Sequence, residues 1–275
     1  MPQSHDITFN DGHTIPRLGF GVWQTPPEAT ADAVAAALAA GYRSIDTAAA
    51  YRNEAGVGEG VKRSGLARDD IFVTTKLWND FHGFDSTLRA FEGSLRRLGL
   101  ERLDLFLIHW PAPKQDRYLE SWRAMIRLRE DGRVTSIGVS NFGPEHLDRI
   151  IGETGVAPAL NQIELHPAFQ QAPMREADAK RGVVTESWSP LGRNGVLDHP
   201  TIEAIARKHG KTPAQVVIRW HLALDLVVIP KSVTPSRIVE NFDSWSFDLD
   251  AADLAAIAAM DDPKGRRGPD PAAFG

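Results

Sequence analysis

Eight short apolar segments that alternate with amphipathic helical stretches constrain the fold of this chain more than any other feature. The apolar segments are rich in Ile, Val, Leu and Phe, as expected of parallel strands that are buried on both faces. They cover residues 20–23, 44–48, 71–77, 103–110, 135–141, 159–165, 183–189 and 226–231. Eight such units, joined by right-handed crossovers, close into a (β/α)8 barrel. We therefore predict a single α/β barrel of the TIM type.

Several segments lie outside the regular repeat. An Asp-Gly turn at 11–12, between two alternating runs, predicts an N-terminal β-hairpin. Two extra helices are expected at 201–209 and 251–260. The Thr-Pro-Ala-Gln sequence at 212–215 predicts a well-capped start for the helix that follows. The segment 261–275 is rich in Gly, Pro and Arg and is expected to be a loop.

A doubly wound nucleotide-binding sheet is the main architectural alternative. It requires the pattern G-x-G-x-x-G after the first strand. Gly19 and Gly21 are followed by Gln24 where the third glycine should stand, and the glycines at 56–58 also lack a third partner. The sequence therefore disfavours this fold. No linker with a shift in composition divides the chain, so residues 1–275 are expected to form one domain.

Composition narrows the classes of function. With 42% hydrophobic and 24% charged residues among 275, the chain is typical of a globular protein with a sizeable core. A net charge of −5 gives no indication of bulk binding to nucleic acid or to anionic membrane. The absence of cysteine excludes disulfides, thiolate catalysis and Cys-ligated metals. No secretory signal is visible at the N-terminus, so we expect a soluble and cytoplasmic protein. We also expect it to be monomeric.

Four side chains at or just beyond the ends of neighbouring predicted strands form one possible acid/base unit: Asp46, Tyr51, Lys76 and His109. In a parallel barrel the C-terminal strand ends meet at one rim, where such barrels carry out their chemistry. A phenol is a poor proton donor near neutrality unless its anion is stabilised, and a nearby ammonium provides that stabilisation. A carboxylate makes the buried lysine less costly, and a histidine supplies a donor to a carbonyl oxygen. The unit therefore predicts carbonyl reduction with Tyr51 as proton donor.

Each of these residues also has a structural interpretation. An isolated Asp or Lys at a strand end more often forms a structural ion pair, and a histidine before Trp-Pro is usually just packed. Tyr51 alone is compatible with a surface position. Charges such as Asp46 and Lys76, however, are almost never buried unpaired. Their joint placement at adjacent strand ends favours the acid/base interpretation.

The segment 229–242 has the pattern of a phosphate site. A strand ends at Lys231, Thr234 is expected to cap the next helix, and a proline takes the first helical position. The helix N-terminus offers free N–H groups, and Ser232 and Arg237 add donors and charge. An arginine beside a lysine favours a dianionic monoester such as a ribose 2′-phosphate. An ordinary capped helix with exposed basic residues is the alternative.

The remaining strand ends carry side chains suited to a cofactor ring and a small substrate. Amide and hydroxyl groups that can bind a carboxamide are provided by Ser140, Asn141 and Gln162, and Trp188 offers a flat face for stacking. Trp23, Trp78 and Trp110 fall near the same rim. An aromatic wall there would form a pocket for a small substrate.

Over nearly its whole length the chain resembles the aldo-keto reductase family, most closely its bacterial 2,5-diketo-D-gluconic acid reductase group. The matching motifs are GYRSIDTAAAYRNE (41–54), TTKLWND (74–80), LFLIHWPAP (105–113), SIGVSNF (136–142), NQIELHP (161–167), ESWSPLG (186–192) and IPKSVTPSRIVENF (229–242). Together these motifs are very specific.

The resemblance implies an NADPH-dependent reductase without a metal. It implies a catalytic tetrad of Asp46, Tyr51, Lys76 and His109. It also implies that Ser140, Asn141 and Gln162 hold the nicotinamide carboxamide, that Trp188 stacks on the ring, and that Ser189 and Leu191 lie along the pyrophosphate. The 2′-phosphate and adenine would be bound by Lys231, Ser232, Val233, Thr234, Arg237, Glu240 and Asn241.

The implied substrates are small-molecule aldehydes and ketones, including α-dicarbonyls and keto-sugars such as 2,5-diketo-D-gluconate. The loops that follow Trp110 and Leu191 are short compared with those of animal members, so substrate specificity does not carry over. Arg266 and Arg267 in the C-terminal tail either meet an anionic substrate or are solvated, and the second interpretation is favoured.

Two other functions stay open at this point. A glycosidase barrel would use two rim carboxylates, for which Glu164 and Glu186 are the candidates. Both lie inside predicted strands, before the rim, which argues against this function. A non-catalytic NADPH-binding regulator is the other alternative, but such a protein has no need of Tyr51.

Overall fold

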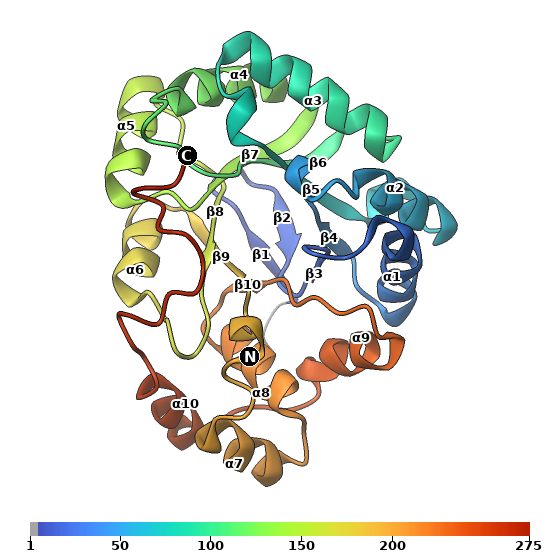
Figure 1. Cartoon of the computed structure of the whole chain (residues 1–275), viewed down its shortest axis with the longest axis vertical. Helices are drawn as coiled ribbons and strands as arrows, with labels where there is room; N and C mark the ends of the chain where they lie inside the picture. Colours follow the sequence, from blue (N-terminus) through green and yellow to red (C-terminus); the bar gives the residue numbers. More distant parts are fainter. Residues whose placement is uncertain (1–4) are drawn as a thin grey trace.

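Eight parallel strands curl into a closed barrel in the computed structural model, which describes residues 5–275 (Figure 1). The strands, in their order around the sheet, are β3 (Phe20–Gly21), β4 (Ser44–Asp46), β5 (Phe72–Leu77), β6 (Leu103–Ile108), β7 (Val134–Ser140), β8 (Leu160–Glu164), β9 (Val184–Trp188) and β10 (Val227–Val228). Closure occurs between β10 and the start of the barrel, where the Gly19 N–H donates to the Val228 carbonyl at 2.9 Å. The predicted barrel is confirmed.

A ring of helices covers the outside of the barrel (Figure 1). They are α1 (Pro27–Ala40), α2 (Glu54–Arg63), α3 (Phe84–Leu98), α4 (Tyr118–Glu130), α5 (Pro144–Thr154), α6 (Ala172–Lys180), α8 (Pro213–Ala223) and α9 (Pro235–Phe242). The two extra helices are present as α7 (Pro200–His209) and α10 (Ala251–Ala258), which contact each other beside α8. Within residues 5–275, the helices are too short or too polar to cross a membrane.

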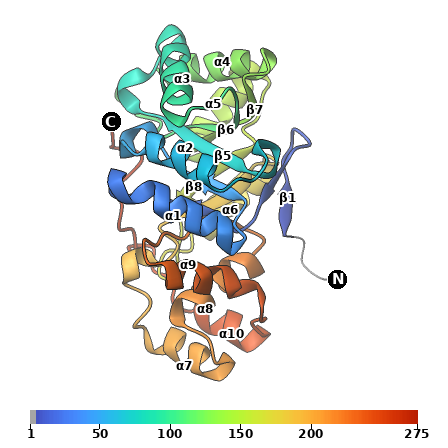
Figure 2. The same ribbon diagram turned by 90° about the vertical axis from the view of Figure 1, so that its right-hand side faces the viewer.

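The N-terminal hairpin closes one end of the barrel. It consists of β1 (Asp6–Thr8) and β2 (Thr14–Pro16), paired antiparallel as predicted. Its apolar residues Phe9 and Ile15 are buried in one cluster with Leu105, Leu107 and Val227. Figure 2 shows the hairpin at the opposite end from the C-terminal segment. The C-terminal strand ends therefore form the accessible end of the barrel.

Except for β7, which has the same length as its predicted run, the observed strands are shorter than the apolar runs that predicted them. The run 226–231 contributes only Val227–Val228 to the sheet, and Asn141 and Ser189 lie just beyond their strands. Both residues have positive φ, 64° for Asn141 and 49° for Ser189, a conformation that turns the backbone away from an extended strand. Asn141 and Ser189 consequently stand on the first residues of the rim loops, whereas Asp46 and Trp188 are the last residues of β4 and β9 and Lys76 lies within β5.

Candidate active site

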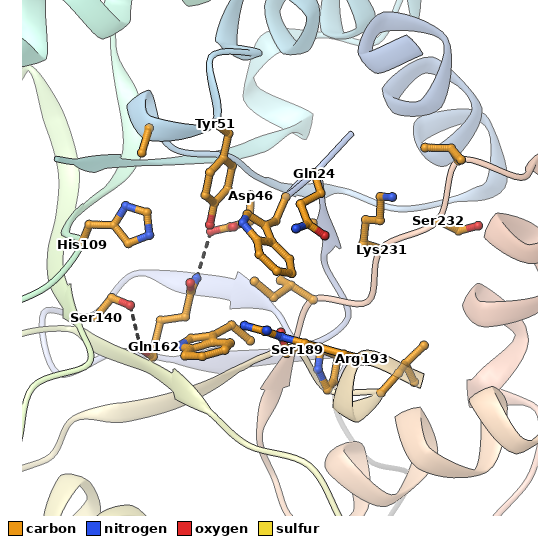
Figure 3. A pocket seen from close by; sticks show the side chains of 18 of the residues that line it. Gln24, Asp46, Tyr51, His109, Ser140, Gln162, Ser189, Arg193, Lys231 and Ser232 are labelled. Carbon is orange, nitrogen blue, oxygen red and sulfur yellow. Dashed lines mark hydrogen bonds between the residues drawn. The ribbon is translucent and has the colours of Figure 1, made fainter. Parts of the chain in front are cut away.

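A cavity of about 1620 Å³ lies at the C-terminal ends of the strands. It is lined by every residue predicted for the site except Lys76, which is fully buried behind it. The close-up in Figure 3 shows the side chains converging from opposite sides of the barrel. At one end stand Tyr51 and His109, and at the other the segment 231–241.

The four residues of the predicted acid/base unit lie together. The Lys76 ammonium donates to Asp46 Oδ1 at 2.6 Å and to the Thr47 carbonyl at 2.8 Å. The same nitrogen is 5.1 Å from the centre of the Tyr51 ring. The Tyr51 ring meets the His109 imidazole edge to face, with centroids 5.6 Å apart. The chain thus brings a phenol, an ammonium and an imidazole to one point of the cavity.

Hydrogen bonds made by neighbouring residues fix the loop that carries Tyr51. Tyr51 ends a short 3-10 helix, η1 (Ala49–Tyr51), that follows β4. The Thr47 hydroxyl donates to Asn53 Oδ1 at 2.8 Å, and Asn53 Nδ2 donates to the Val22 carbonyl at 2.9 Å. Buried Glu54 accepts from the Thr75 hydroxyl at 2.7 Å. These bonds restrict the position from which the phenol reaches the cavity.

Burial and charge set the ionisation of this cluster. Burial raises the pKa of Tyr51, although the Lys76 ammonium opposes the rise. Burial by itself would lower the pKa of Lys76, but the charges of Asp46 and Tyr51 outweigh this effect, so the pKa of Lys76 is raised. The pKa of His109 falls well below its usual range, first through burial and then through the Lys76 charge. At neutral pH the cluster holds an ammonium, a neutral imidazole and a protonated phenol.

The residues predicted to bind a carboxamide are linked to one another. The Ser140 hydroxyl donates to the backbone carbonyl of Gln162 at 2.8 Å (Figure 3), and Asn141 Nδ2 donates to Ser140 Oγ at 2.9 Å. The Trp188 indole donates to Asn141 Oδ1 at 2.9 Å. The Gln162 side-chain amide points inward, and its Nε2 donates to Asp46 Oδ2 at 2.9 Å and to Glu186 Oε2 at 2.7 Å. This network holds the indole ring in place along the cavity wall.

The predicted phosphate site is exposed. The side chains of Lys231 and Arg237 form no ion pair or hydrogen bond with another residue of the described part of the chain. The Thr234 N–H donates to the Ser232 hydroxyl at 3.1 Å. Thr234 stands at the N-cap of α9, but its side chain accepts no bond from the helix, so the expectation of a side-chain cap was wrong. The first N–H groups of α9 are therefore not satisfied by that threonine.

The aromatic wall includes one ring that the sequence did not suggest. The ring centroids of Trp78 and His109 lie 5.2 Å apart, and those of Trp110 and Trp188 lie 6.3 Å apart. Phe274, from the C-terminal segment, packs 4.7 Å from Trp110 and lines the cavity with them. In the sequence, the sign that could have pointed to this ring was one aromatic residue, Phe274, in a tail rich in Gly and Pro.

The C-terminal segment is fixed to the rim by Glu164. Its carboxylate accepts the N–H groups of Arg267 at 2.7 Å and Gly268 at 2.9 Å. These bonds and a contact with His166 outweigh burial and lower the pKa of Glu164. The Arg266 guanidinium lies 4.8 Å over the Phe169 ring. In the described part of the chain, Glu164, Arg266 and Arg267 do not line the cavity. Because a glycosidase needs two carboxylates at the cavity and Glu164 was one of the two candidates, that function gains no support.

Two further cavity residues were missed from the sequence. Arg193, in the loop after β9, places its guanidinium 5.1 Å from the centre of the Trp23 ring, and both residues line the cavity. Gln24 follows Trp23 at the rim. Both Gln24 and Arg193 have positive φ, as Asn141 and Ser189 do. Such conformations cluster at functional sites, but nothing local in the sequence marks them.

A closed parallel barrel with this buried cluster at its open end is a barrel enzyme, and comparisons with known proteins give its class. A profile of the Aldo/keto reductase family matches residues 17–262. An aldo-keto reductase of Mycolicibacterium smegmatis is 56% identical over 268 residues, 98% of this chain and 97% of its own. The methylglyoxal reductase DkgA of Escherichia coli is 54% identical over 271 residues, 98% of each chain.

Solved structures agree. A Gox0644 variant in complex with NADPH superposes with a TM-score of 0.95 at 55% identity, covering 100% of both chains. The aldo-keto reductase AKR2E4 of Bombyx mori in complex with NADP gives a TM-score of 0.89 at 36% identity, covering 96% of this chain and 94% of its own. The chain belongs to the aldo/keto reductase family.

Proposed function

We propose that this protein reduces aldehydes and ketones to alcohols, with NADPH as the hydride donor. The observation that carries the proposal is the position of Tyr51, whose ring lies 5.1 Å from the Lys76 ammonium and 5.6 Å from the His109 ring at the edge of a large cavity. A phenol in that position can deliver a proton to a small molecule in the cavity.

The four clustered residues divide the proton transfer between them. When bound, NADPH would supply a hydride for the carbonyl carbon. Tyr51 donates its phenolic proton to the carbonyl oxygen, which becomes the alcohol oxygen. Lys76 stabilises the tyrosinate that remains, and Asp46 keeps the buried ammonium in place through the 2.6 Å ion pair. The neutral ring of His109 donates a hydrogen bond to the carbonyl oxygen, which polarises it and orients the substrate.

The rest of the cavity suits a dinucleotide with a 2′-phosphate. The cavity runs from Tyr51 past Trp188 to the exposed cations Lys231 and Arg237, which have no partner among residues 5–275. We assign the carboxamide to Ser140, Asn141 and Gln162, the ring face to Trp188, and the pyrophosphate to Ser189 and Leu191. The 2′-phosphate and adenine fall to Lys231, Ser232, Val233, Thr234, Arg237, Glu240 and Asn241. Complexes of Gox0644 with NADPH and of AKR2E4 with NADP support this cofactor.

Small α-dicarbonyls and keto-sugars are the proposed substrates. The wall formed by Trp23, Trp78 and Trp110 and by Phe274 encloses a compact space beside His109. DkgA, a similar protein, is named a methylglyoxal reductase. A single domain, a cytoplasmic location and a monomeric state remain predictions from the sequence.

A substrate panel tests the proposal. NADPH oxidation is followed by absorbance with methylglyoxal, 2,5-diketo-D-gluconate and simple aldehydes and ketones, and each reaction is repeated with NADH. We expect turnover of at least one dicarbonyl, and a higher kcat/KM with NADPH than with NADH. Failure to oxidise NADPH with every carbonyl, while NADPH still binds, would instead favour the non-catalytic regulator.

A further inference from the structure

One titratable group beside the reaction site has no role in the mechanism above. Glu186, on β9, is 1% exposed and faces the interior of the barrel. It does not line the cavity, so it contacts neither cofactor nor substrate there. A carboxyl in such a place requires an explanation, since buried charges are rare unless paired.

The amide of Gln162 connects Glu186 to the acid/base cluster. Gln162 Nε2 donates to Glu186 Oε2 at 2.7 Å and to Asp46 Oδ2 at 2.9 Å. Figure 3 shows the amide of Gln162 bonded to Asp46 on one side. A side-chain amide has two N–H donors, and both are used here. Two carboxyl groups therefore share one amide group.

The surroundings of Glu186 favour its neutral form. The neighbouring strands present uncharged residues at its level, Gln162 from β8 and Val227 from β10. The charged and titratable groups that act on it from across the barrel are Asp46, Lys76 and Tyr51. The single ammonium is already bonded to Asp46 at 2.6 Å. A second carboxylate would leave the cluster with an uncompensated negative charge in a medium of low dielectric.

We infer that Glu186 is a positioning residue for the reduction, and that it acts as a neutral acid which holds the Gln162 amide against Asp46 and keeps excess negative charge away from Tyr51. This inference rests on the proposed reductase function. The geometry is accompanied by a matching ionisation: burial raises the pKa of Glu186 to about 8, and the Asp46 charge adds to the rise.

The consequence concerns the acidity of Tyr51. Loss of its proton to the carbonyl oxygen creates a tyrosinate in the cluster. An ionised Glu186 raises the pKa of Tyr51, so it opposes this step, whereas the neutral acid does not. Carbonyl reduction should then weaken as Glu186 ionises. The alkaline limb of the pH profile would report Glu186 rather than Tyr51 itself.

The test compares Glu186→Gln with the wild type. The substituted amide keeps the shape and the acceptor for Gln162 but cannot ionise. At saturating NADPH, kcat/KM for the carbonyl should fall in the wild type as the pH rises through about 8, where Glu186 ionises. In Glu186→Gln the alkaline limb of the pH profile should shift to higher pH by about one pH unit or more. NADPH affinity, measured by fluorescence, should change little.

Asp178→Asn is the matched control. Asp178 is another buried carboxyl, on α6, and burial raises its pKa to about 7. It accepts from Asn161 and Thr185, away from the tetrad. Its substitution should leave the alkaline limb in place. Infrared spectra give a readout without turnover: a protonated carboxyl band that disappears near pH 8 in the wild type should be missing from Glu186→Gln and retained in Asp178→Asn.

Each outcome separates the inference from the function on which it rests. An active wild type whose alkaline limb is unchanged in Glu186→Gln overturns the inference, as does an equal change in Asp178→Asn. A loss of activity in Glu186→Gln that is uniform with pH would indicate a structural role only. A wild-type protein that reduces no carbonyl overturns the reductase function, while the infrared titration still decides whether Glu186 is neutral.

Discussion

The two ends of the cavity are built on opposite principles. At the end with Tyr51 and His109, which we propose transfers the proton and call the proton-transfer end, Lys76 and Asp46 are buried and bonded to each other and to their surroundings. At the other end, Lys231 and Arg237 are exposed, and neither side chain bonds to another residue within 5–275. A buried charge must be paired to be tolerated, whereas an exposed one costs little and stays available for a ligand. The first end is organised before any ligand binds, and the second obtains its partner from the ligand.

This comparison predicts that the two ends fail in different ways. Substitutions at the proton-transfer end should reduce the rate or the stability of the fold. Those at the exposed end should change affinity alone, because the folded protein does not depend on contacts there.

The largest effect is expected for Tyr51→Phe. Removal of the phenolic proton should lower kcat by about 10²–10⁴-fold, the usual contribution of a positioned general acid. NADPH affinity should be unchanged, since the ring remains. Stopped-flow or steady-state NADPH oxidation measures the rate and fluorescence titration measures binding.

The control for this substitution is Tyr118→Phe. Tyr118 is a buried tyrosine on α4, and its hydroxyl accepts from Arg149 at 3.3 Å, outside the cavity. It should keep near wild-type kcat. Near wild-type turnover in Tyr51→Phe would remove Tyr51 from the role of proton donor and with it the division between the two ends.

Lys76→Met tests the buried end through stability. The substitution leaves Asp46 buried without its ammonium, and breaking such a pair costs about 3–5 kcal/mol. Urea unfolding followed by circular dichroism should show this loss in the free energy of unfolding. Arg237→Ala should change that free energy by less than about 0.5 kcal/mol, as expected of an exposed site. Equal losses in the two variants would contradict the contrast between the ends.

The sequence predicted the proton-transfer end better than its connections. Each of the four residues lies near or just beyond the end of an apolar run, and the barrel brings strand ends to one rim, so local pattern and topology were sufficient to bring them together. The bond between Gln162 and Glu186 was not predicted because it depends on side-chain orientation across two strands. The position of Phe274 depends on how the tail is fixed by Glu164, far away in the sequence.

Helix starts show a similar limit. The sequence at 212–215 forms the predicted capping box, in which the Thr212 N–H donates to Gln215 Oε1 at 3.0 Å. Thr234 also precedes a proline, but Arg237 stands where a glutamine would complete the box, and its side chain makes no capping bond. The two helix starts thus differ in whether the threonine side chain caps the helix. The difference also leaves the start of α9 available to a ligand.

The smallest effect is expected for Arg237→Ala on cofactor affinity. If its guanidinium binds the 2′-phosphate, the loss of a charge-assisted hydrogen bond should cost about 1.5–3 kcal/mol, or roughly 10–150-fold in the Kd of NADPH. NADH lacks the 2′-phosphate, so its Kd should change by less than about twofold. Fluorescence titration with both cofactors measures the ratio. Arg96→Ala, which removes an exposed arginine of α3 outside the cavity, controls for the change in net charge. Equal weakening of NADPH and NADH would place the 2′-phosphate elsewhere and leave the exposed end without an assigned ligand group.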